Sequence, residues 1–171
     1  GRRLPRYLGE SYALGDQPYV EDMSAPGMLH GALRLSDHPR AIVKSIDTSK
    51  AEALAGVERV ATAQDVRGTR RYGLIEQDWA SFIAIGETTC MVGDVIAAVA
   101  ATDRVTARKA AELIVIEYEV LEPITDSVAA MAADSPQVHA NRGNLLSTTK
   151  YARGDVDAAF VSSAHVVKDT F

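Results

Sequence analysis

The sequence has one cysteine, Cys90, among its 171 residues. A single thiol excludes an internal disulfide, and it excludes a zinc or iron–sulfur site built from several cysteines. No apolar run is long enough to cross a bilayer, and the first residues lack the pattern of a secretory signal peptide. We therefore expect a protein of the cytoplasm, a reducing compartment, with no membrane partner.

The sequence also lacks an excess of positive charge. It carries 18 lysines and arginines against 23 aspartates and glutamates, a net charge of −5, which argues against a nucleic-acid partner. The short motifs of phosphate-binding loops, dinucleotide-binding turns and serine hydrolases are all absent. With 47% hydrophobic and 24% charged residues, the composition is that of a soluble globular domain.

The clearest pattern is a strand, a helix and a second strand between residues 94 and 119. A continuous apolar run at 95–101 predicts a buried strand, and Thr102 or Asp103 can cap the helix that follows. An alternating segment at 114–118 predicts the second strand. Because such a crossover usually joins parallel neighbours, we predict an α+β fold with a mixed sheet. The helix presents one apolar stripe, made of Ala107, Ala110, Ala111 and Ile114.

The residues before this unit contain further strand patterns. Alternation predicts a strand at 29–35, with Leu29, Leu33 and Leu35 on one face. Three further strands are expected at 41–46, 57–61 and 88–91. Residues 75–85 lack periodicity and are interpreted as a long surface connection.

A short helix is predicted between two of these strands. Ser49 and Glu52 match a capping box, in which each side chain satisfies the backbone N–H of the other residue. We expect the helix to run to about Ala55, with Gly56 in the left-handed conformation that ends many helices.

The C-terminal part has weaker signals. Asp126 or Ser127 can cap a small alanine-rich helix, and a second short helix begins at Asp155. Residues 145–151 and 164–171 are predicted to be extended. The chain begins without methionine and ends inside a strand pattern, so we expect a piece of a longer protein. We divide it into an irregular segment at 1–25, a folded domain at 26–121 and a connection at 122–171.

Reactive side chains are present but lack the arrangement that chemistry requires. Cys90 is a candidate nucleophile, although its position in a strand pattern is more typical of an inert thiol. Asp155 and Asp157 are spaced like calcium ligands, but a helix cap explains them better. Glu117 and Glu119 are either paired carboxylates or the exposed face of a strand. The four histidines show no metal-binding spacing: His30, His38, His139 and His165.

One loop collects positive charge. Arg67, Arg70 and Arg71 lie within five residues and could hold a phosphate or an acidic partner, although a solvated loop is the better interpretation. From the residues alone we assign no catalytic, cofactor-binding or metal-binding residue. Those residues point to a scaffold or interaction domain.

Six stretches follow one another in a recognisable order. They are P-G-M-L-H-G-A-L-R-L-S-D-H-P-R-A (26–41), I-D-T-S-K-A-E-A-L-A-G-V (46–57), V-A-T-A-Q-D-V-R-G (60–68), V-G-D-V-I-A-A-V-A-A (92–101), Y-E-V-L-E-P (118–123) and R-G-D-V-D-A-A-F (153–160). In this order they resemble the molybdopterin-dependent xanthine dehydrogenase and aldehyde oxidase family. The D-W-A-S-F and G-E-T-T segments look closer to the xanthine dehydrogenase branch.

The resemblance implies the α/β-hammerhead domain at the start of the molybdenum-binding subunit. Its parent enzyme would hydroxylate a purine-like or aldehyde carbon with oxygen from water, using molybdopterin and passing electrons to iron–sulfur clusters. The expected partners are the molybdopterin-binding domains of the same chain and an iron–sulfur domain or subunit. The family's cofactor-holding and catalytic groups lie in later domains, so no residue here takes such a role. The family usually has L-P after Tyr-Glu-x, where this chain has Leu121-Glu122-Pro123.

Two other interpretations compete with this one. The first is a stand-alone scaffold or carrier-like binding module, although the M-K-M pattern of a carrier is absent. The second makes Cys90 the nucleophile of a hydrolase or transferase. If the chain is a piece of a larger enzyme, apolar surfaces that the parent covers should make it self-associate.

Overall fold

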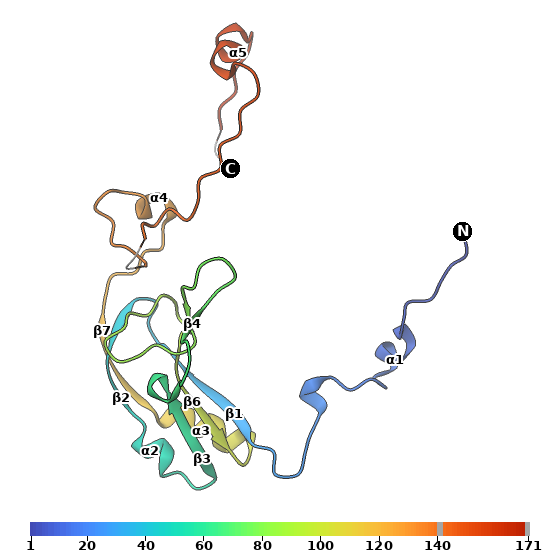
Figure 1. Cartoon of the computed structure of the whole chain (residues 1–171), viewed down its shortest axis with the longest axis vertical. Helices are drawn as coiled ribbons and strands as arrows, with labels where there is room; N and C mark the ends of the chain where they lie inside the picture. The colour runs from blue at the N-terminus through green and yellow to red at the C-terminus, as the bar shows by residue number, and fades with distance from the viewer. Residues whose placement is uncertain (140–141, 170–171) are drawn as a thin grey trace. The chain divides into compact units, whose positions relative to one another are not determined.

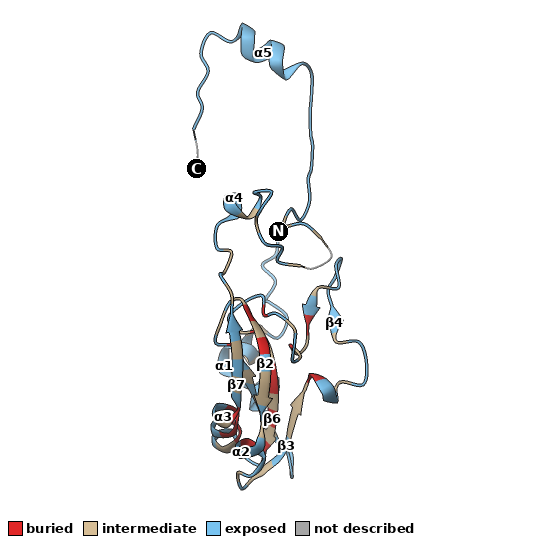
Figure 2. Ribbon diagram, turned by 90° about the vertical axis from the view of Figure 1, so that its left-hand side faces the viewer, coloured by how far each residue is buried: buried red, intermediate tan, exposed pale blue. Residues whose placement is uncertain are grey.

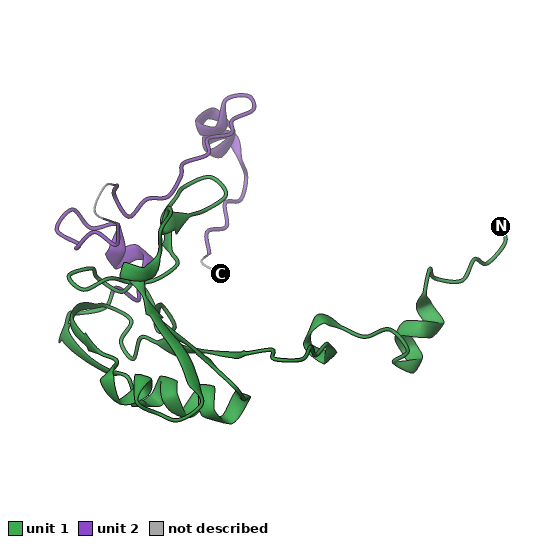
Figure 3. Ribbon diagram, turned by 60° about the horizontal axis from the view of Figure 1, so that its bottom comes forward, with its two compact units in different colours: residues 1–123 green, residues 124–171 purple. Residues whose placement is uncertain are grey.

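The computed structural model describes residues 1–139 and 142–169. It divides into two compact units, Gly1–Pro123 and Ile124–Phe171, which Figure 3 colours separately. Every named strand of the described residues belongs to the first unit. The hydrophobic core of the chain therefore lies there as well.

The central strand of the first unit is β6 (Val95–Ala101), which has a strand on each side (Figure 1). Its neighbours are β1 (His30–Leu35) and β3 (Val57–Thr62), and both pair with it antiparallel. Buried residues of β6 fall on both faces of the sheet, as its continuous apolar sequence predicted. The predicted strand is confirmed at both ends.

Helix α3 (Arg104–Leu113) covers one face of this sheet. Asp103 is the N-cap, since its carboxylate accepts hydrogen bonds from the N–H groups of Val105 and Thr106 at 2.9 Å each. The predicted apolar stripe is confirmed, because its four residues are at most 5% exposed. Their small side chains let the helix lie close to the sheet. The last three residues of the stripe form one core cluster with side chains of α2 and β6: Ala51, Ala97 and Val99.

The second strand of the predicted crossover does not join this sheet. Strand β7 (Val115–Val120) pairs antiparallel with β2 (Ala41–Asp47) in a separate two-stranded sheet. The parallel pairing, and with it the mixed sheet, was wrong: all the ladders of the described residues are antiparallel. Strands β1 and β3 already occupy both edges of β6, so β7 has no edge of β6 to pair with. The α+β class itself is confirmed.

The segment at 83–89 links the two sheets through its backbone. The N–H of Ile83 donates to the carbonyl of Val95 on β6 at 2.8 Å, and the N–H of Val43 on β2 donates to the carbonyl of Glu87 at 3.0 Å. The strand predicted at 88–91 is reduced to one isolated bridge, between Ile42 and Thr88. This link closes a second core cluster, made of Val43, Ala80, Ile83 and Ile96.

A small hairpin begins just before the predicted surface connection at 75–85 and extends into it. Strands β4 (Arg71–Tyr72) and β5 (Trp79–Ala80) pair antiparallel, and Ala80 is buried. The interpretation of 75–85 as a long surface connection holds for the exposed residues 75–77, but it missed β5 and the buried side chains of Ala80 and Ile83. Two residues per strand are too few to leave a periodic signal in the sequence.

The short helix between β2 and β3 differs from the predicted one. Helix α2 (Ser49–Glu52) has Thr48 at its N-cap, without a bond from the cap side chain to the helix backbone, so the predicted capping box does not form. The Glu52 carboxylate instead accepts a bond from the Thr48 hydroxyl at 2.7 Å. The helix also ends earlier than expected, but Gly56 does adopt a left-handed φ of +90°. After β3, the 3-10 helix η2 (Ala63–Asp65) carries a capping box between Thr62 and Asp65.

Strand β1 turns its leucines toward solvent. Leu33 and Leu35 are 56% and 40% exposed, while Ala32 and Arg34 are half-buried on the face toward α3. Arg34 is held there, because its guanidinium donates to the Ile114 carbonyl at 3.3 Å and to Asp37 at 2.6 Å. The part of the sheet face around Leu33 and Leu35 is therefore apolar and left exposed by the described residues, and Figure 2 shows that exposure is widespread outside the core.

The first residues are more regular than predicted. The segment called irregular contains α1 (Gly9–Leu14) and the 3-10 helix η1 (Val20–Asp22), although neither has a buried residue. Short helices of this kind form from local hydrogen bonds, which apolar periodicity does not reveal.

The second unit contains two short helices, α4 (Ser127–Ala130) and α5 (Val156–Ser162). Their caps are confirmed: Asp126 accepts from the Ala129 N–H at 2.6 Å, and Asp155 accepts from the Ala158 N–H at 2.9 Å. The described residues of the predicted extended segments, 145–151 and 164–169, form no strand. A strand needs a neighbouring strand for its backbone groups, and the named strands of the described residues pair with one another inside the first unit. Residues 170 and 171 lie outside the described part.

Candidate functional site

The densest polar cluster of the first unit surrounds Glu87. Arg70 binds its carboxylate with two parallel hydrogen bonds, at 3.0 Å and 2.9 Å. A third bond comes from the Ala84 N–H at 2.9 Å, and Arg71 adds a weaker ion pair at 3.4 Å. Arg70 also donates to the Phe82 carbonyl at 3.1 Å. We call this group the Glu87 clamp.

The clamp is partly shielded from solvent. The Arg70 and Glu87 side chains are 29% and 24% exposed. The two hydrogen bonds from Arg70 are the main cause that lowers the pKa of Glu87 from its usual 4.5 to about 2, with the Ala84 N–H and Arg71 adding to the effect. The same pairing raises the pKa of Arg70. The carboxylate is therefore ionised at all physiological pH values and cannot act as a proton donor or acceptor near neutrality.

The clamp decides between the two interpretations of the arginine loop. Arg70 and Arg71 both form ion pairs with Glu87, so neither is a free cation available to bind a phosphate. Arg67 remains exposed. The prediction of a solvated loop was also incomplete, because the Arg70 side chain is largely shielded. Glu87 escaped prediction because 17 residues separate it from Arg70, and no local pattern links the two.

The surroundings of Cys90 disfavour its thiolate form. Its backbone N–H donates to the Asp94 carboxylate at 2.6 Å, and that carboxylate also accepts the Met91 N–H at 3.2 Å. Although Cys90 has exposed surface, desolvation raises the pKa of its thiol, and the Asp94 carboxylate adds to the shift. A nucleophilic cysteine needs the opposite change, which a nearby cation or base would produce. The structure thus gives the nucleophile hypothesis no support.

The two candidate carboxylates on β7 stabilise the fold. Glu117 accepts a bond from the Ser45 hydroxyl at 2.7 Å, and Glu119 pairs with Lys44 at 3.0 Å, so both link β7 to β2. The described residues contain no group of three or more histidine, cysteine, aspartate or glutamate side chains able to hold a metal ion. Within 1–139 and 142–169, no helix is long and apolar enough to span a membrane.

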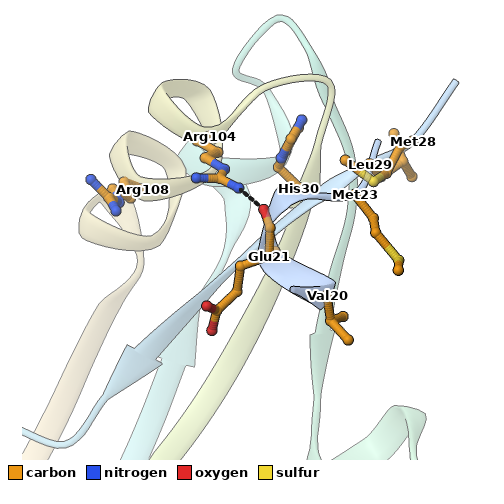
Figure 4. Close-up of a pocket in the computed structure, with 9 residues that line it drawn as sticks. Val20, Glu21, Met23, Met28, Leu29, His30, Arg104 and Arg108 are labelled. Carbon is orange, nitrogen blue, oxygen red and sulfur yellow. Dashed lines mark hydrogen bonds between the residues drawn. The ribbon is translucent and has the colours of Figure 1, made fainter. Parts of the chain in front are cut away.

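A shallow cavity of about 560 Å³ lies between the 20–31 segment and α3 (Figure 4). Two arginines and a histidine line it, with methionines and the Glu21 backbone. In Figure 4 the Arg104 guanidinium points at the Glu21 carbonyl, to which it donates at 3.4 Å, while Arg108 points away from His30. The two guanidinium groups and the imidazole do not converge on one point. The cavity therefore lacks the arrangement that would hold a phosphate or a pterin by directed bonds.

The sequence matches one family profile over residues 14–122, described as "Aldehyde oxidase and xanthine dehydrogenase, a/b hammerhead domain". The match begins at the last residue of α1 and ends just after β7, so it covers all the named strands of the described residues.

Individual relatives extend this match to nearly the whole chain. The chain is 36% identical to a probable xanthine dehydrogenase subunit of Bacillus subtilis (strain 168), over 95% of its own length and 22% of that protein. It is also 36% identical to the "Nicotinate dehydrogenase large molybdopterin subunit" of Eubacterium barkeri, over 92% of its length and 36% of that protein. This chain thus spans about a fifth to a third of the length of these two relatives.

The fold is also that of solved enzymes with similar sequences. The crystal structure of quinoline 2-oxidoreductase from Pseudomonas putida 86 superimposes with a TM-score of 0.80 at 34% identity. That alignment covers 96% of this chain and 22% of the enzyme chain. An aldehyde oxidoreductase from Desulfovibrio gigas superimposes with a TM-score of 0.78 at 30% identity, over 94% of this chain and 19% of that one.

Proposed function

Because the chain belongs to the aldehyde oxidase and xanthine dehydrogenase family, with its a/b hammerhead domain at residues 14–122, we propose that it is a non-catalytic structural domain of a molybdenum hydroxylase. The parent enzyme would resemble xanthine dehydrogenase. It would hydroxylate a purine-like or aldehyde carbon with oxygen derived from water. The molybdopterin would bind to the part of the parent that this chain does not include, and an iron–sulfur domain or subunit would accept the electrons in the cytoplasm.

One observation carries this proposal: the chain aligns along 95% of its length with only 22% of a relative named as a probable xanthine dehydrogenase subunit. The site supports the same view. The strongest polar cluster is internally satisfied by Arg70, Arg71 and Ala84, which leaves no free acid or base in it. An iron–sulfur cluster needs several thiolates, and the sequence supplies one. These observations favour a chain that depends on other parts of the parent for both cofactors.

The domain's role in the parent would be to support the structure of the enzyme. Its two sheets and α3 make a body with its own core, and the hairpin and the leucines of β1 present apolar surface to the outside. A domain of this kind stabilises an enzyme by filling and shaping the space around the catalytic domains, without touching the reacting atoms.

The test is to read the gene beyond the codon for Phe171 and to compare the two products. The full-length protein should contain molybdenum and oxidise a heteroaromatic or aldehyde substrate. The 171-residue chain should contain no stoichiometric molybdenum by elemental analysis and should leave xanthine and hypoxanthine unchanged. A stop codon directly after Phe171, or molybdenum bound by the short chain, would contradict the proposal, and a stop codon would favour a stand-alone scaffold.

A further inference from the structure

The hairpin formed by residues 71–80, which we call the arm, carries an unusual set of side chains at its free end. Tyr72 and Trp79 are 50% and 59% exposed, and their rings lie 6.2 Å apart. Between them, Leu74 is completely exposed and Ile75 is 90% exposed. Figure 2 colours almost the whole arm as exposed. Four large apolar side chains on one short hairpin are too many for a surface that stays in water.

The base of the arm is firmly held. Ala80 and the nearby Ile83 are buried in the second core cluster, and the Ser81 N–H donates to the Arg70 carbonyl at 2.7 Å. The Glu87 clamp fixes the first strand of the arm from the other side, through Arg70 and Arg71. The arm is thus rigid where it leaves the body and apolar where it ends.

The turn at the free end has a defined shape. A side chain at Gly73 would place its Cβ 1.8 Å from the Glu76 carbonyl oxygen, so only glycine fits there. Arg71 spans the hairpin and donates to the Asp78 carbonyl at 3.3 Å. A long flexible loop would not need such constraints. They favour a turn that presents Leu74 and Ile75 in one fixed arrangement.

We propose that the arm is a docking element that inserts into an apolar cleft on the remainder of the parent molybdenum-binding chain. This inference rests on the proposed function. Aromatic and branched side chains concentrated on a rigid projection are the composition of interaction hot spots. The cleft would lie on the part of the parent that this chain does not include. That part is large, because this chain matches only 22% of one relative and 36% of the other. Exposed Glu76 beside the apolar tip favours a basic group at the rim of that cleft.

Hydroxyl-radical footprinting of Trp79, read by mass spectrometry, tests the proposal directly. We expect the oxidation of Trp79 in the full-length protein to be roughly tenfold slower than in the 171-residue chain, since a docked ring is shielded from solvent. The short chain is measured at the lowest workable concentration, because a chain without its parent is expected to self-associate through the same apolar surfaces. Equal rates in the two proteins would overturn the proposal.

A pair of variants separates docking from folding. Leu74→Gln combined with Ile75→Gln should leave the melting temperature of the short chain unchanged, because both side chains are already in water. In the full-length protein the same change should reduce the yield of soluble, molybdenum-loaded enzyme roughly tenfold. Val105→Gln, at a 75% exposed position on α3, is the matched control and should reduce that yield by less than about twofold.

Different results would contradict the proposed function and the docking proposal. If the reading frame ends after Phe171, or the long product lacks molybdenum, the proposed function fails whatever the footprint shows. If the long product is a molybdenum enzyme, but the tip variant assembles normally and Trp79 stays reactive, only the docking proposal fails.

Discussion

Replacing Glu87 by glutamine should destabilise the first unit through one identifiable interaction. The substitution keeps the volume of the side chain but removes the charge that binds Arg70 at two points. An amide offers one acceptor oxygen in place of two, and its NH₂ group would face Arg70 or the Ala84 N–H. The arginine would then be left partly shielded without its counter-ion.

The size of the effect follows from the pKa of Glu87. Each pKa unit corresponds to about 1.36 kcal/mol, so a lowering from 4.5 to about 2 sets an upper limit near ~3 kcal/mol. The two side chains keep 29% and 24% of their exposure, and solvent screening reduces the value of such a pair. We therefore expect Glu87→Gln to lower the free energy of unfolding by about 1–2 kcal/mol at pH 7.

The pH dependence has a definite sign. The pKa of Glu87 is lower in the folded protein than in the unfolded chain, so folding is favoured when the carboxylate is ionised. This stabilisation is complete above the unfolded value of 4.5 and is lost as the pH falls toward about 2. The difference between wild type and Glu87→Gln should therefore shrink by more than half between pH 6 and pH 3.

Urea unfolding, followed by the fluorescence of Trp79, measures the free energy of unfolding of wild type and variant. Trp79 is the only tryptophan and lies in the arm that the clamp holds, so its signal reports on the right region. The control is Glu119→Gln, whose Lys44 pair is more than half exposed on both sides and should cost less than about 0.5 kcal/mol. Equal losses for the two variants, or a Glu87→Gln loss that is the same at pH 3 and pH 6, would refute the reasoning.

Two further predictions concern the core and can be checked by thermal or urea unfolding. Ala110→Leu and Ala111→Leu should each cost roughly 1–3 kcal/mol, because both residues are at most 5% exposed between α3 and the sheet, while Lys109→Leu should be nearly neutral; equal shifts for all three would mean that the helix does not face the sheet as described. Thr89→Val should cost about 1–3 kcal/mol, because the buried hydroxyl accepts from the Ala41 N–H at 2.9 Å and donates to the His38 carbonyl at 3.1 Å, and valine would leave both unpaired. Thr88→Val, next to it but exposed, should change the stability little, and a similar loss there would argue against the hydrogen-bond explanation.

The features predicted well from the sequence are those decided by neighbouring residues. Helix α3 was located with its buried face and with Asp103 as one of two candidate caps, since these residues lie close together along the chain. The left-handed Gly56 and the caps Asp126 and Asp155 follow from the same local rules. The family resemblance was also readable from the order of the motifs, and the comparisons confirm it.

The pairing of strands was not predictable in the same way. The crossover from β6 through α3 to β7 has the length of one that joins parallel neighbours, yet β7 pairs with β2. What decides the outcome is competition for the edges of β6. Strands β1 and β3 take both edges, although they come from much earlier in the chain: His30 and Val57 both pair with Ala101. No pattern within residues 94–119 contains that information.

Which face of β1 is buried was also not predictable from the sequence, and the answer bears on function. Alternation predicted a strand at 29–35 and grouped its leucines, but periodicity says only that two faces differ and not which face meets the core. Here α3 covers the side of Ala32 and Arg34, because Arg34 can satisfy its guanidinium at the helix end and at Asp37. The leucines are left outside, like the tip of the arm. A sequence in which the apolar face of a strand points away from its own core is consistent with a domain whose remaining contacts lie on other parts of a larger enzyme.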